Sequence, residues 1–258
     1  DKPDDTILYP LGCVYDSALQ NIPWLLEKKA PYLSVILPTK NREKMLSACL
    51  EHLAAQTLDK SLYEVLVVEN ECQISEETKK IQENFANRMQ IKLFACGTPG
   101  PAAARNVALS FAQGSIVIFI RDDIFLAPDA LARHWEFHEK NPALSEAMLG
   151  YSKISNSCEL SHWLDKNDLL FNWTAIAEKK LSLGFDCFFT SHVSVKRSLF
   201  HIIGNFDESF SRACMEDIEW AYRACKAGMN LTFDPLAIAE HIHDYDWESY
   251  WKRCYISG

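Results

Sequence analysis

Two adjacent aspartates, Asp122 and Asp123, follow the apolar run Ile116–Ile120 after a single residue, Arg121. At the end of a buried strand, two carboxylates repel each other and lose hydration, which raises the cost of ionising both. A divalent cation relieves this cost, and Mg²⁺ in proteins usually takes one or two carboxylates together with waters and phosphate oxygens. We therefore predict an Mg²⁺ or Mn²⁺ site at this point. The alternative is that the pair only caps a turn or a helix.

Two histidine pairs are further candidate metal ligands. His241 and His243 alternate along a predicted strand, so both imidazoles would lie on one face of it, beside the metal site at Asp123. Which of the two meets the metal stays open. His134 and His138 have the i,i+4 spacing of one helix face. They belong to an amphipathic segment, however, and we expect that helix to expose them to solvent.

A second acidic pair, Glu216 and Asp217, precedes a stretch of helical periodicity that ends at Gly228. Carboxylates at a helix N-terminus commonly accept hydrogen bonds from its free N–H groups, and the helix dipole favours their charge. This capping role accounts for the pair without any chemistry. The alternative is that one carboxylate is a general base, kept ionised by the helix N-terminus.

The elements that would position these residues alternate between apolar strands and helices of ten or more residues. This alternation predicts an α/β fold with a mostly parallel central sheet and helices on both faces. We expect strands at 32–37, 63–70, 90–96, 116–120, 193–195, 231–233 and 237–241. We expect helices through 45–53 with Asn41 as its cap, through 81–85, to about residue 112, and at 128–139, 161–170 and 217–227. Ligands of such sheets bind at the carboxyl ends of the strands, where Thr39 and Glu69 would join Asp122 in one crevice.

Composition and absent motifs narrow the function. The 258 residues carry 35 acidic against 26 basic side chains, a net charge of −9 that argues against general nucleic-acid binding. No glycine-rich dinucleotide or P-loop motif follows the first strand. Nine cysteines without a CxxC pair predict reduced thiols in a cytoplasmic protein. No apolar run approaches the about 20 residues of a membrane span. A peripheral position at the inner face of a membrane is a second expectation for the localisation.

Seven segments in order resemble family-2 glycosyltransferases with the GT-A fold, over roughly residues 33–245. They are SVILPTKNR, VLVVEN, GPAAARNVAL, IFIRDDIFLAPDAL, FFTSHVSVKRSLFHIIGNFDESF, MEDIEWAYRACKAG and LTFDPLAIAEHIH. The resemblance implies a metal-dependent transfer of a sugar, with inversion, from a nucleotide diphosphate donor to a hydroxyl of a glycan or another acceptor. A UDP-sugar is the expected donor. It also implies a nucleotide-binding half over residues 32–130 and an acceptor half over residues 131–258 of a single domain, with residues 1–31 as an extension packed on it.

The resemblance also assigns roles to individual residues. Nucleotide contacts fall on Pro38, Thr39, Lys40, Glu69, Arg105 and Asp122, where Glu69 would read the nucleobase and Asp122 would face the ribose. The metal contacts fall on Asp123 and on His241 or His243. Asp217 matches the base, and Glu216 would support it. Two positions depart from the family: Arg121 stands where an aspartate is common, and Glu69-Asn70-Glu71-Cys72 stands where DDGS is common.

Two rival functions remain open. The first is a catalytically silent nucleotide-sugar-binding scaffold, for which the two departures are the only support. The second is a sugar-phosphate nucleotidyltransferase, which would need a glycine-rich signature near the first strand that PTKNREK lacks. The acceptor would contact the second half of the chain, whose aromatic side chains suit sugar rings but equally suit a core. The candidates are Trp163, Phe171, Trp173, His192 and Trp247.

Overall fold

The computed structural model describes residues 33–155, 158–167, 169, 171–178, 183–213, 215–243 and 246–257. The predicted extension over residues 1–31 lies outside the described residues. Among the residues that are described, no helix is both long and apolar enough to cross a membrane.

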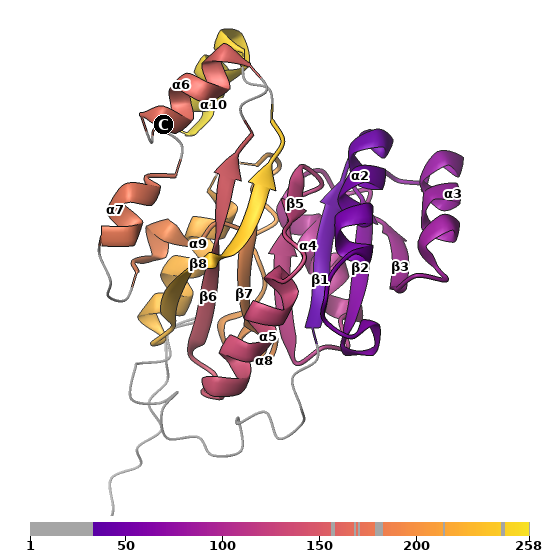
Figure 1. Cartoon of the computed structure of the whole chain (residues 1–258), viewed down its shortest axis with the longest axis horizontal. Helices are drawn as coiled ribbons and strands as arrows, with labels where there is room; N and C mark the ends of the chain where they lie inside the picture. Colours follow the sequence, from indigo (N-terminus) through magenta and orange to yellow (C-terminus); the bar gives the residue numbers. More distant parts are fainter. Residues whose placement is uncertain are drawn as a thin grey trace, which may run out of the picture.

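One mixed sheet of eight strands runs through the described chain, in the order β3-β2-β1-β4-β7-β6-β8-β5 (Figure 1). The strands are β1 Leu33–Thr39, β2 Tyr63–Glu69, β3 Gln90–Ala95, β4 Ile116–Ile120, β5 Ile124–Leu126, β6 Glu146–Ile154, β7 His192–Lys196 and β8 Asn230–His241. β1 pairs in parallel with β2 and β4, β2 with β3, and β6 with β8. β7 is antiparallel to β4 and β6, and β5 to β8. This arrangement confirms the predicted α/β fold with a mostly parallel sheet.

Helices cover both faces of the sheet because its central strands are apolar on both sides. Along β1, Val35 and Leu37 join a core with α2, α3 and α5, whereas Ile36 joins a core with α4, α8 and α9. Helices α6 and α10 lie together at one end of the molecule (Figure 1). The helices are α2 Glu43–Ala54, α3 Glu76–Phe85, α4 Pro101–Phe111, α5 Ala130–Lys140, α6 Glu159–Lys166, α7 Trp173–Glu178, α8 Ser198–Ile203, α9 Glu216–Lys226 and α10 Trp247–Ser257.

Two predicted details of these elements are wrong. The segments 231–233 and 237–241 form one strand, β8, because its pairing register with β6 shifts between Gly150 and Tyr151 and takes up Pro235 without ending the strand. Asn41 does not cap α2. It adopts a left-handed backbone conformation with φ of 51°, which asparagine tolerates, and Arg42 occupies the N-cap position.

The histidine pair of α5 is buried rather than exposed as the sequence predicted. His134 Nδ1 and His138 Nε2 lie 2.7 and 2.9 Å from the hydroxyl oxygen of Ser194 on β7. The fully buried ring of His192 lies 5.0 Å from that of His134. It fills the space beside Gly150, where a Cβ atom would approach the imidazole to 2.3 Å. These histidines are therefore part of the core.

We expect this histidine core to weaken the fold in acid. Burial lowers the pKa of all three imidazoles, that of His192 from 6.5 to about 4. Below pH 6.5 the unfolded chain binds more protons than the folded one, so the free energy of unfolding decreases as the pH is lowered. For His192 alone the decrease is about 2 kcal/mol at pH 5, relative to neutral pH. His192→Phe should flatten the acid decline of the thermal unfolding midpoint, and the exposed-site control His201→Phe should not. An equally steep decline in His192→Phe would contradict this assignment.

Candidate active site

A cleft of about 820 Å³ opens at the carboxyl ends of the central strands. Its wall combines residues after β1 and β4 with the start of α4 and the first turn of α9, so both halves of the chain contribute. Seven of the predicted nucleotide-binding and catalytic residues line it: Pro38, Thr39, Lys40, Arg105, Asp122, Glu216 and Asp217. The fold thus brings together two acidic pairs that lie almost a hundred residues apart in the sequence.

Asp122 is fixed at the cleft by the neighbouring parallel strand. β1 and β4 pair with Ile36 opposite Phe119, so Thr39 and Asp122, each three residues further on, leave the sheet side by side. The Thr39 hydroxyl donates to Asp122 Oδ2 at 2.8 Å, and Arg42 Nη1 donates to Oδ1 at 2.8 Å. Burial raises the pKa of this carboxyl, and Arg42 opposes the rise.

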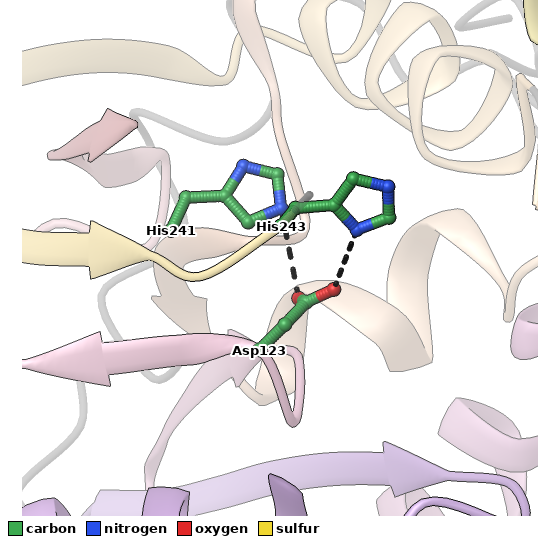
Figure 2. Close-up of side chains that lie close together, drawn as sticks. All are labelled: Asp123, His241 and His243. Carbon is green, nitrogen blue, oxygen red and sulfur yellow. Dashed lines mark ion pairs between the residues drawn. The ribbon is translucent and has the colours of Figure 1, made fainter. Parts of the chain in front are cut away.

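Asp123 meets both candidate histidine ligands (Figure 2). The antiparallel pairing of Ile124 with His241 places His241 Nε2 3.7 Å from Asp123 Oδ1. His243, two residues past the register partner and beyond the end of β8, places Nδ1 3.6 Å from Oδ2. One ligand atom from each of the three residues lies within 4.8 Å of the others. The structure therefore brings these three residues together, as the sequence predicted.

The ionisation of this trio suits a divalent cation. Burial acts to raise the pKa of the Asp123 carboxyl, but Arg121 and the two histidines outweigh it and hold the pKa well below its usual value. Burial lowers the pKa of His241, which keeps that imidazole neutral at neutral pH. A metal needs an ionised carboxylate and neutral imidazoles as ligands. Asp123 Oδ1 is buried and accepts no hydrogen bond within the described residues, which leaves it available to an ion. The donor set fits a metal.

Glu216 and Asp217 occupy the opposite wall, in the first turn of α9. Arg105 Nη1 lies 2.7 Å from Glu216 Oε1, and both side chains are buried. Asp217 Oδ2 accepts hydrogen bonds from the backbone N–H of Thr190 at 3.2 Å and from its hydroxyl at 3.0 Å. Asp217 Oδ1 accepts from the backbone N–H of Ile218 at 3.0 Å. These contacts fix the orientation of the Asp217 carboxyl.

The pKa of Asp217 reflects opposing influences. The helix N-terminus was expected to keep the carboxylate ionised, but burial and the neighbouring Glu216 raise its pKa, opposed by Arg105 and the Thr190 hydrogen bonds. Burial has this effect because it removes water that would stabilise the charged form of the carboxyl. A raised pKa makes the ionised carboxylate a stronger proton acceptor.

Two predicted nucleotide-binding residues, Arg105 and Glu69, have protein partners in the structure. The Arg105 guanidinium lines the cleft but is engaged by Glu216. Glu69 is buried, and its Oε2 accepts a hydrogen bond from the backbone N–H of Ser75, the N-cap residue of α3. The next residue, Asn70, lines the cleft instead and holds the loop before α4 through Gly100 N–H. The nucleotide roles of Arg105 and Glu69 stay predictions.

Sequence reasoning also missed residues of the cleft, and its aromatic candidates are not all found on the cleft wall. Arg42, within the quoted PTKNR segment, contacts both aspartates, and Thr190 holds Asp217. Of the aromatic candidates for acceptor binding, Phe171 lines the cleft. Trp173 and His192 are buried, and Trp163 and Trp247 contact each other outside the cleft. Phe189 and Tyr250 line it in their place.

Residues 34–197 match glycosyl transferase family 2, which is more than half of the chain. The chain belongs to this family. TarS of Staphylococcus aureus, a poly(ribitol-phosphate) beta-N-acetylglucosaminyltransferase, is 37% identical over 100 residues, which are 38% of this chain and 17% of that protein. The chain spans under a fifth of the length of the first curated relatives it matches.

Two solved structures share the fold. TarS 1–349 in complex with UDP-GlcNAc matches with a TM-score of 0.66 and 21% identity, over 83% of this chain and 59% of the other. The mannosyltransferase PcManGT from Pyrobaculum calidifontis, in complex with GDP-Man and Mn²⁺, matches with a TM-score of 0.68 and 20% identity, over 92% of this chain and 65% of the other. The predicted GT-A fold is confirmed by these likenesses.

Proposed function

We propose that this domain is a divalent-metal-dependent glycosyltransferase that moves a sugar, with inversion, from a nucleotide diphosphate donor to a hydroxyl acceptor. The observation that carries the proposal is one cleft with the Asp123–His241–His243 trio beside one wall and the partly buried Asp217 carboxyl on another. Family membership supports it, as do a relative bound to a UDP-sugar and another bound to a GDP-sugar with Mn²⁺.

The donor would bind on the β1–β4 side of the cleft. Asp123, His241 and His243 would hold the cation, and the two imidazoles favour Mn²⁺ over Mg²⁺, which prefers oxygen ligands. When bound, the cation neutralises the charge that develops on the departing diphosphate. Thr39 and Asp122 would orient the ribose, with their mutual hydrogen bond fixing the carboxylate. Lys40 and Pro38 would border the nucleotide from the loop after β1.

The acceptor would approach from the α9 side. Inversion requires the hydroxyl to attack the anomeric carbon on the face opposite the diphosphate, so the proton acceptor must stand apart from the metal. Asp217 meets this condition, and its raised pKa suits proton transfer. Thr190 orients the carboxyl, and Arg105 holds Glu216 beside it. The proton passes to Asp217 as the new oxygen–carbon bond forms.

We expect Glu69 to set the base preference. Its place at the end of β2 lets a carboxylate accept a ring N–H, most readily from uracil. Glu69→Ala should weaken UDP binding by about 1–3 kcal/mol, the cost of a buried hydrogen bond to a charged group. Glu76→Ala, which removes an exposed carboxylate at the start of α3 that pairs with Lys79, is the control and should bind UDP normally. Equal calorimetric affinity of the intact protein for UDP, GDP and CDP would rule out base reading by Glu69.

The test of the function is release of free nucleoside diphosphate from UDP- and GDP-sugars, with Mn²⁺ or with EDTA, in the presence of glycan and polyol-phosphate acceptors. Metal-dependent release with acceptor glycosylation is expected. Binding without release would instead support a silent scaffold. Formation of a nucleoside triphosphate from a nucleotide sugar and pyrophosphate would instead support a nucleotidyltransferase.

A further inference from the structure

Arg42 contacts both aspartates of the donor side. Its Nη1 lies 2.8 Å from Asp122 Oδ1 and 3.2 Å from Asp123 Oδ2, so one guanidinium nitrogen bridges the two carboxylates. Arg121 adds a second guanidinium, with Nη2 3.0 Å from Asp123 Oδ2. The site therefore contains two carboxylates and two guanidinium groups, whose formal charges cancel.

This balance has a consequence for metal binding. A divalent cation that enters alone adds two positive charges beside two arginines, and it must compete with Arg42 for the oxygens of Asp123. A cation that enters with a nucleoside diphosphate brings compensating negative charge. The diphosphate also offers the arginines new partners, and guanidinium groups bind phosphate oxygens through paired N–H donors. The contacts of the two arginines with the aspartates thus disfavour binding of the cation alone and favour binding of the cation together with a nucleoside diphosphate.

The position of Arg42 permits such an exchange of partners. It lines the cleft at the start of α2, and 35% of its side chain is exposed, so the guanidinium can turn without disturbing the core. A phosphate oxygen and a carboxylate oxygen that share one cation both lie about 2.1 Å from it, and so lie close to each other. A guanidinium now 3.2 Å from Asp123 Oδ2 is therefore beside the space that the diphosphate would occupy.

We propose that Arg42 is a resident counter-ion of the Asp122–Asp123 pair that transfers to the donor's diphosphate, so that cation and nucleotide bind cooperatively and the cation alone binds weakly. This inference rests on the proposed donor site. The inference adds Arg42 as a residue that binds the diphosphate. It also predicts that the cation binds well only when the nucleotide is present.

The test is the Mn²⁺ affinity of Arg42→Met, measured from the free-ion signal in electron paramagnetic resonance, without nucleotide and with UDP or GDP, whichever binds the intact protein more tightly. Without nucleotide, Arg42→Met should bind Mn²⁺ more tightly than the intact protein, because a competing cation is gone. In the presence of Mn²⁺, its nucleotide affinity should fall at least about tenfold, the factor for a lost hydrogen bond to a charged group. A purely structural arginine would not move the two affinities in opposite directions.

Two variants support the comparison. Arg133→Met is the matched control, because Arg133 also bridges two carboxylates, those of Asp129 and Asp234, with 32% of its side chain exposed and no place on the cleft wall. It should leave both affinities unchanged. Arg42→Lys keeps the positive charge but lacks the planar guanidinium, so its Mn²⁺ affinity should stay low while its nucleotide affinity falls. This variant tests the proposal even if Arg42→Met folds poorly.

The outcomes separate this inference from the function beneath it. If the intact protein binds nucleoside diphosphate with Mn²⁺ but Arg42→Met matches it in both affinities, or weakens both, the counter-ion role is wrong and the donor site stands. If the intact protein shows no Mn²⁺-linked binding of either nucleotide, the donor site itself is wrong and the inference falls with it.

Discussion

Asp217→Asn should retain nucleotide and Mn²⁺ affinity while it loses most sugar transfer, by roughly 10²–10⁴-fold, the usual contribution of a positioned general base. The substitution keeps the shape of the side chain and removes its basicity. Asp217 faces the acceptor side and contacts neither the Asp123 trio nor Arg42, so donor binding has no reason to change. Release of nucleoside diphosphate and calorimetric binding measure the two properties separately.

Glu219→Gln is the matched control, because Glu219 is also in the first turn of α9 but pairs with Arg223 outside the cleft. It should transfer sugar normally. The base must be ionised to act, so transfer by the intact protein should decline as pH falls through the pKa of Asp217. Burial and Glu216 raise that pKa, and the decline therefore begins at higher pH than an ordinary aspartate would give. Near-normal transfer by Asp217→Asn, or loss of donor binding with activity, would exclude Asp217 as the base.

Strands β1 to β4 could be predicted from the sequence because they are short apolar runs separated by amphipathic helices, whereas β5 and β6 were not predicted. That alternation fixes the parallel order, and parallel order places the ends of neighbouring strands together. The position of Thr39 beside Asp122 follows from it directly. The motif series in the second half also placed Glu216 and Asp217 correctly on the cleft, although no local pattern there distinguishes a base from a helix cap.

Other features depend on tertiary contacts that no local pattern records. His134 and His138 read as a polar helix face, yet Ser194 on β7 offers them a hydroxyl inside the core. Asp217 reads as a helix cap in its own segment, yet the residue that orients its carboxyl, Thr190, comes from a segment 27 residues earlier. Arg42 was not assigned because its partners, Asp122 and Asp123, lie about 80 residues away. In each case the deciding partner comes from a distant segment.

Asp123→Ala should abolish Mn²⁺-dependent nucleotide binding while the fold survives. The carboxylate is fully buried and would be the anionic metal ligand beside His241 and His243, so its loss would leave only the two neutral imidazoles. The adjacent sheet does not depend on the side chain, because β5 is held to β8 through the backbone, including the bond from Ile242 N–H to the Asp123 carbonyl. Thermal unfolding reports the fold, and calorimetry of nucleotide with Mn²⁺ or EDTA reports the site.

Asp129→Ala supplies the control, since Asp129 is an exposed aspartate six residues further on that pairs with Arg133. Its metal-linked binding should equal that of the intact protein. Asp123→Ala should also differ from Arg42→Met. Arg42→Met should bind Mn²⁺ alone more tightly than the intact protein, whereas Asp123→Ala should fail to bind Mn²⁺ either alone or with nucleotide. If calorimetry of folded Asp123→Ala showed the same Mn²⁺-linked nucleotide affinity as the intact protein, the cation would have to bind elsewhere, and the trio at the end of β8 would lose its assigned role.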